Sequence, residues 1–290
     1  MPGIDVHQHL WPEPLQRALA ARTEPPCLVR RTEGWVLRLA GEPESAFDPG
    51  AHDPAARAGL VEEDGLGRAL IAPSVPLGIE SLAAVEAEPL LAAYHDGVLA
   101  LGEPFGAWAA VGLAAPDLPG GAFAGACVPA AALAGPGALD RLGPVLEALE
   151  RRDAALLVHP GPAGAPEGAP AWWPALNGYV AQMQAAWHGF GLWGRPAHPR
   201  LRVCFAMLAG LAPLQRERLV ARGGRPAPDP LAFLETSSYG ARAVDAILRE
   251  VGVDQLVHGS DRPVIAAAEL PFGDAVAAAL RERNPARLLG

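Results

Sequence analysis

The chain has 290 residues, half of them apolar, with a formal charge of −9 and a pI near 5.4. This acidic balance argues against a nucleic-acid or anionic-membrane partner, because both bind a basic face. The sequence contains no uncharged apolar run of about 18 residues, so we expect no membrane span.

Eight short apolar segments alternate with segments of helical pattern, which is typical of βαβ units around a parallel sheet. The expected strands are residues 3–8, 68–73, 107–113, 124–129, 154–159, 201–207, 231–236 and 254–259. Eight such strands fit a closed (β/α)₈ TIM barrel better than an open sheet. The 33 glycines and 31 prolines are spread along the chain and do not pool into a linker, so one domain over residues 1–290 is expected.

Helices are expected between these strands. Asp53-Pro54 is a helix start, with Asp as the N-cap and Pro at the first helical position. Further helices are expected at 80–101, 138–152, 174–190, 211–222, 240–251 and 273–283.

Two long connections interrupt the alternation. An insertion of roughly residues 10–50 follows the first strand, and within it residues 28–40 predict a β-hairpin that turns at Glu33-Gly34. Residues 160–174 form a Pro- and Gly-rich loop that contains Trp172 and Trp173. Both connections follow the carboxyl ends of strands, where barrels hold their active sites, so both are candidate pocket walls.

The first predicted strand ends in His7-Gln8-His9. Residues i and i+2 of a strand point to the same side, so both imidazoles can reach one point at the mouth of the barrel. An HxH pair alone is weak evidence, because two exposed histidines give the same pattern. Its place at the end of a barrel strand favours a metal site.

Two more polar side chains follow strand ends. His159 ends the fifth strand and Asp261 follows the eighth. Taken singly, His159 could be a hydrogen-bonded strand-end histidine and Asp261 a helix cap. Together with His7 and His9, they make a four-ligand set for Zn²⁺ or a similar ion.

These motifs resemble the metal-dependent hydrolases of the amidohydrolase superfamily, within the amidohydrolase-2 group that includes aminocarboxymuconate-semialdehyde decarboxylase. The segments that carry the resemblance are 5–12 (DVHQHLWP), 156–162 (LLVHPGP), 201–213 (LRVCFAMLAGLAP), 257–263 (VHGSDRP) and 284–290 (NPARLLG). The resemblance implies a TIM barrel, metal ligation by His7, His9, His159 and Asp261, and a homodimer.

The chain departs from this family in two respects. The sixth strand of the family usually ends in a histidine, to which decarboxylase relatives owe activation of the metal-bound water, whereas this chain has Met207. Members with two ions bridge them with a carboxylated lysine, but all 23 basic residues here are arginines. We therefore expect one ion per chain, and no Schiff-base chemistry.

Other side chains have both a structural and a functional interpretation. Arg262 could bind a substrate carboxylate or form an ordinary salt bridge, and His188 could reach the pocket or lie on a helix surface. Trp172 is a candidate for the pocket wall. Strand alternation turns His258 away from the barrel axis, and Cys204 is expected in the core. The remaining histidines are expected on loops or helix surfaces: His52, His95 and His198.

The function that the sequence favours is hydrolysis of a small ester-, lactone- or amide-like bond. A bound ion lowers the pKa of its water to about 7, and Asp261 takes the proton of that water and later delivers it. The alternatives are non-oxidative decarboxylation of an aromatic or unsaturated carboxylate and a barrel without catalysis. The three separated cysteines and a start without a signal-peptide pattern favour the cytoplasm.

Overall fold

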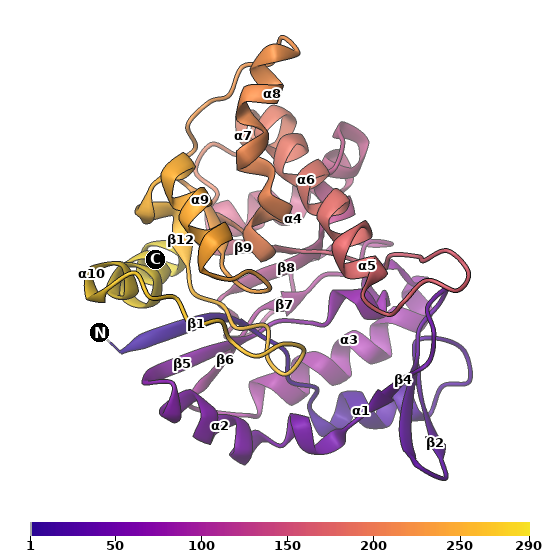
Figure 1. Cartoon of the computed structure of the whole chain (residues 1–290). Helices are drawn as coiled ribbons and strands as arrows, with labels where there is room; N and C mark the ends of the chain where they lie inside the picture. The colour runs from indigo at the N-terminus through magenta and orange to yellow at the C-terminus, as the bar shows by residue number, and fades with distance from the viewer. Residues whose placement is uncertain (1) are drawn as a thin grey trace.

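The computed structural model describes residues 2–290, and its parallel strands follow the predicted order around a barrel (Figure 1). The barrel strands are β1 (Gly3–Gln8), β5 (Leu66–Ile71), β6 (Phe105–Ala107), β7 (Ala109–Ala110), β8 (Gly125–Pro129), β9 (Ala155–His159), β10 (Val203–Phe205), β11 (Ala232–Glu235) and β12 (Leu256–Val257). β6 and β7 are two parts of one strand separated by Trp108, so the total matches the eight predicted.

Backbone hydrogen bonds close the ring of strands. Val6 N donates to His258 O at 2.9 Å and Ser260 N donates to His7 O at 3.2 Å, which joins β1 to the residues after β12. Ala124 N donates to Ala107 O at 2.9 Å, which joins β6 to the start of β8. The predicted closed barrel is confirmed, with its first and last strands adjacent.

Side chains from all eight strands fill the barrel interior. They form one buried cluster that includes Val6, Leu70, Trp108, Cys127, Leu157, Cys204, Phe233 and Val257. Trp108 Nε1 donates to Val6 O at 2.8 Å, which satisfies the one polar group of this large side chain. Cys204 lies in the core as predicted.

Helices cover the outside of the barrel, with α1–α3 on one side and α6–α9 on the other (Figure 1). The helices are α1 (Glu13–Ala20), α2 (Pro54–Glu63), α3 (Ala84–Leu99), α4 (Pro136–Arg151), α5 (Trp173–Leu176), α6 (Gly178–Gly189), α7 (Arg195–Ala197), α8 (Arg216–Ala221), α9 (Ala241–Val251), α10 (Asp274–Ala278) and α11 (Asn284–Leu289). α2 starts as predicted, because the Asp53 carboxylate accepts from Ala56 N at 2.8 Å. Among residues 2–290, no helix combines the length and the apolar character needed to cross a bilayer.

The insertion after β1 forms a small antiparallel sheet. The hairpin is confirmed as β2 (Cys27–Arg31) and β3 (Gly34–Arg38), with Arg31 opposite Gly34, so it turns at Thr32-Glu33, one residue before the predicted turn. A third strand that was not predicted, β4 (Ser45–Phe47), pairs with β3.

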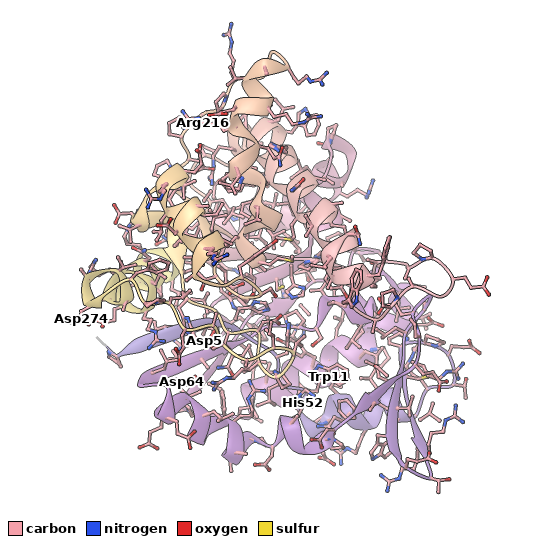
Figure 2. The ribbon with its side chains drawn as sticks, in the orientation of Figure 1. Asp5, Trp11, His52, Asp64, Arg216 and Asp274 are labelled. Carbon is pink, nitrogen blue, oxygen red and sulfur yellow. The ribbon has the colours of Figure 1, made fainter. Side chains whose placement is uncertain are left out.

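Three histidines expected on loops or helix surfaces are less exposed than that expectation implies. His52 is buried beneath the insertion, where its ring stacks on Trp11 at 5.2 Å between centroids, and Figure 2 shows the two together. His52 Nδ1 accepts from Trp11 N at 3.1 Å. His198 is 7 % exposed, and His95 is half-buried and accepts from Ala110 N at 3.0 Å. The rings of His52 and His95 have aromatic neighbours that only the folded chain supplies.

The predicted helix at 211–222 is α-helical only in its second half, since residues up to Gln215 form a 3₁₀ segment. Five consecutive residues from Met207 to Leu211 have φ between 44° and 62°, in the left-handed region, and α8 begins only at Arg216. The apolar spacing of this segment is compatible with either handedness, so it does not indicate the left-handed turn.

Candidate metal centre

The four predicted ligands meet at the carboxyl end of the barrel. His7 lies in β1 with His9 just beyond it, His159 is the last residue of β9, and Asp261 follows β12. One donor atom from each lies within 4.8 Å of the others. The three histidines are buried, and the Asp261 side chain is 13 % exposed. The predicted convergence is therefore present in the fold.

Each of the three imidazoles uses its Nδ1 in a hydrogen bond that points away from the centre. The partner of His7 Nδ1 is Glu235 Oε2 at 3.1 Å, that of His9 Nδ1 is Ala72 O at 3.1 Å, and that of His159 Nδ1 is Pro160 O at 2.8 Å. All three partners are acceptors, so Nδ1 keeps its proton and Nε2 is the nitrogen whose lone pair would bind an ion. Three lone pairs are thus directed at one point.

The spacing of the donor atoms suits a single ion. His7 Nε2 lies 3.2 Å from His9 Nε2, and Asp261 Oδ1 lies 3.0 Å from His9 Nε2 and 3.7 Å from His7 Nε2. Tetrahedral ligands at about 2.1 Å from an ion lie roughly 3.4 Å apart. Asp261 Oδ1 is buried and has no aligned hydrogen bond from residues 2–290, a position that a cation would satisfy.

Electrostatics at the centre favour a cation. Burial alone would lower the pKa of His7, but Glu235 and then Asp261 outweigh it and raise that pKa to about 9. Burial alone would raise the pKa of Asp261, but the contact with His9 Nε2 at 3.0 Å and the charges of the three imidazoles lower it to about 2. The pKa of His159 falls well below its usual range through burial and the charges of His7 and His9. A bound ion would replace the proton held on His7.

The backbone around the ligands is fixed by a buried carboxylate. Asp5 Oδ1 accepts from His7 N at 3.0 Å and from Ser260 N at 3.1 Å, so it joins the ends of the first and last strands. Asp261 has φ 58°, a left-handed conformation that Asp tolerates, and its N donates to His7 O at 2.9 Å. The two ligand-bearing segments are therefore held in register.

Sequence reasoning missed Glu235, which is fully buried and hydrogen-bonded to His7. It ends the seventh strand, in LAFLET (231–236), and a charged residue at the end of an apolar strand is the signal that singled out His159. It also missed Tyr179 of α6, whose pKa is raised by burial and then by the charges of Glu42 and Asp261.

The three predicted substrate-binding side chains lie apart from the donors. Arg262 Nη1 is 2.8 Å from Asp64 Oδ2, the ordinary salt bridge that the sequence left open. Trp172 is 55 % exposed and His188 is exposed on α6. Arg262 contacts the donors through its backbone, since its carbonyl oxygen accepts from His9 N at 2.6 Å. Within residues 2–290, no hydrogen bond, ion pair or ring contact joins the side chains of these three to the four donors, so their roles stay predictions.

His7→Ala is expected to lose the metal, whereas His258→Ala is expected to keep it. His258 is buried at 5 % exposure, but it lies outside the donor set, and its backbone N donates to Leu280 O at 2.8 Å. Elemental analysis of both purified variants, beside their thermal melting curves, measures the difference. Metal lost from folded His258→Ala, or full metal in His7→Ala, would contradict the donor set.

Comparison with known proteins identifies the fold. No protein-family model and no curated protein matches the chain. An IDCase from Metarhizium anisopliae in apo form matches with a TM-score of 0.81 and 18 % identity, over 99 % of this chain and 97 % of that one. The 5-carboxyvanillate decarboxylase LigW from Sphingomonas paucimobilis matches with a TM-score of 0.74 and 16 % identity, over 99 % and 98 %.

A third solved structure contains a metal. The dihydroxybenzoic acid decarboxylase from Polaromonas sp. JS666, with bound manganese and the inhibitor 2-nitroresorcinol, matches with a TM-score of 0.70 and 14 % identity, over 99 % of this chain and 96 % of that one. At these identities the likeness establishes the shared fold. That fold agrees with the resemblance to the amidohydrolase-2 group, which includes decarboxylases.

Proposed function

We propose that this protein is a metal-dependent, non-oxidative decarboxylase of an aromatic or unsaturated carboxylate. The observation that carries the proposal is the shared fold with solved decarboxylases over nearly the whole of both chains, together with donors for one ion at the barrel mouth. This reverses the order favoured by the sequence, in which hydrolysis stands first.

The proposed cofactor is one divalent ion. A chain without lysine cannot form the carboxylated-lysine bridge between two ions. Three imidazoles and one carboxylate suit Zn²⁺, and Mn²⁺ is the alternative because the Polaromonas enzyme binds it. When bound, the ion supplies positive charge that binds substrate oxygens and stabilises developing negative charge.

Decarboxylation requires one proton at the carbon that loses the carboxylate. The carbon–carbon bond breaks, CO₂ leaves, and the electron pair stays on the carbon until a proton reaches it. The three imidazoles commit Nδ1–H to buried acceptors and Nε2 to the centre, and the thioether of Met207 carries no proton. Among the donors, Asp261 is the group that can relay this proton, since its carboxylate is partly accessible.

The test is a substrate panel with metal-loaded protein. Aromatic and enoic carboxylates form one arm, with released CO₂ as the readout, and small lactones, esters and amides form the other. CO₂ release that disappears after chelation and returns with Zn²⁺ or Mn²⁺ is expected. Hydrolysis faster than every decarboxylation would overturn the proposal.

Hydrolysis through a metal-activated water is the second candidate, and Met207 favours it. A hydrolase that uses Asp261 as its base needs no histidine at the end of β10, whereas decarboxylases of the resembling family use one. Both candidate reactions use the Asp261 carboxylate to carry the proton, so replacing Asp261 does not distinguish them. The substrate panel does, because it measures CO₂ release and hydrolysis separately.

Met207→Leu is expected to retain most of the activity, whichever reaction is catalysed. Leu has a similar volume and, like Met, cannot carry a proton, and the hydrogen bond from residue 207 comes from its backbone N. Steady-state kinetics of the variant and the parent on the best substrate measure this. A tenfold or larger fall in kcat with unchanged metal content would show that the thioether itself takes part.

A further inference from the structure

We propose that Glu235 is a positioning residue that orients His7 and sets the metal affinity of the centre. This inference rests on the proposed metal centre but not on the reaction. Glu235 touches neither the ion nor the substrate. It acts through His7, whose Nδ1 lies 3.1 Å from Glu235 Oε2.

Four hydrogen-bond donors converge on the Glu235 carboxylate. Besides His7 Nδ1, Oε2 accepts from Met207 N at 3.1 Å and from Ser237 Oγ at 2.7 Å, and Oε1 accepts from Ser237 N. The residue is 0 % exposed. A buried carboxylate is costly unless it is hydrogen-bonded and charge-balanced, so this site is built for an anion.

The Glu235 carboxylate fits in its position because the residue beside it, Gly259, has no side chain. A Cβ at Gly259 would lie 2.2 Å from Glu235 Oε1 and 2.5 Å from its Cδ, closer than any side chain can approach. Gly259 follows β12 and stands next to the turn that carries Asp261. The placement of Glu235 therefore depends on residues from β1, β11 and the ends of β10 and β12.

The end of β10 contributes its backbone to the same site. Met207 enters the left-handed turn with φ 44° and donates its N–H to Glu235. Left-handed conformations are costly for residues with a Cβ, and strained segments of this kind gather at functional sites. The end of β10 thus contributes to the metal centre through the hydrogen bond from Met207 N to Glu235.

A charged acceptor on Nδ1 has two consequences for His7. It fixes the tautomer that leaves the Nε2 lone pair for the ion, and it makes Nε2 a stronger donor. Such carboxylate partners contribute about 10- to 100-fold to metal affinity. In Glu235→Gln the amide oxygen can take the place of Oε2 and accept from Met207 N and Ser237 Oγ, but the amide NH2 cannot accept from Ser237 N. The variant therefore removes the charge at nearly constant volume.

The experiment measures zinc affinity directly. Chelator-stripped full-length protein is titrated with Zn²⁺ in competition with a chromophoric chelator at pH 7.5. Glu235→Gln is expected to bind Zn²⁺ about 10- to 100-fold more weakly than the parent. Glu80→Gln is the matched control, since Glu80 is also buried but lies outside the donor set, and it is expected to match the parent.

A second variant provides an independent test in case Glu235→Gln does not fold. Glu235→Asp keeps the charge but withdraws the carboxylate from His7 by one methylene, so it too is expected to weaken Zn²⁺ binding.

Parent-like affinity in either folded Glu235 variant overturns the inference, as does an equal loss in Glu80→Gln or absence of Zn²⁺ binding by the parent. A 10- to 100-fold loss confined to the Glu235 variants supports it. If that pattern holds and no carboxylate of the panel releases CO₂, the inference stands while the proposed function fails.

Discussion

Asp261→Asn is expected to lower kcat by about 10²- to 10⁴-fold, the contribution typical of a group that transfers a proton in the transition state. The carboxylate is one of four donors and the one that can relay a proton, whether to carbon in decarboxylation or from water in hydrolysis. Asparagine keeps the shape but neither accepts that proton nor binds the ion well.

Two losses must be separated in this variant, because the proposal gives Asp261 two roles. Kinetics are measured at Zn²⁺ or Mn²⁺ concentrations that restore full metal content, confirmed by elemental analysis. Activity that stays low in fully loaded Asp261→Asn assigns the proton transfer to the carboxylate, whereas activity that returns with the ion would limit Asp261 to ligation. Asp245→Asn, an exposed carboxylate paired with Arg249 on α9, is the control and should behave as the parent.

The strands that carry the ligands could be predicted from the sequence. The expected 3–8 and 154–159 correspond to Gly3–Gln8 and Ala155–His159, because in both cases a buried apolar run stops at a histidine. Their order then places both ends on one face of a parallel barrel, whatever the exact pairing. The convergence of His7, His9, His159 and Asp261 followed from that topology.

The surroundings of the ligands could not be predicted in the same way. The contact between Met207 and Glu235 uses the backbone N–H of Met207. Because this group does not depend on the residue type, no sequence pattern indicates the contact. The left-handed turn after β10 depends on packing against α6, where a Cβ at Gly210 would lie 2.7 Å from Val180 O. Whether Arg262 faces a substrate or Asp64 is likewise decided by contacts with a residue 198 positions away.

A further expected effect concerns stability, and it arises at Glu80. This residue follows β5, is 2 % exposed, and its Oε2 has no hydrogen-bond partner among residues 2–290. Burial raises the pKa of its carboxyl group from 4.5 to about 7. The native state therefore holds a proton that the unfolded chain releases at lower pH.

The sign of the resulting pH dependence follows from this difference. Between pH 4.5 and pH 7 the native state binds more protons at Glu80 than the unfolded state, so the free energy of unfolding falls as pH rises. The stabilising contribution is fully present below pH 4.5 and is lost once pH passes 7. At 1.36 kcal/mol for each pKa unit, the loss amounts to about 3 kcal/mol.

Glu80→Gln is therefore expected to gain stability relative to the parent as pH rises, because the amide stays neutral. Urea unfolding at pH 5 and pH 8 gives the free energy of unfolding of both proteins, and their difference should shift by about 2.5 kcal/mol in favour of the variant. Glu88→Gln, at an exposed position of α3, should show no such shift. A parallel pH dependence of the parent and Glu80→Gln would mean that Glu80 is ionised in the native protein, with its charge satisfied by water that reaches the carboxylate.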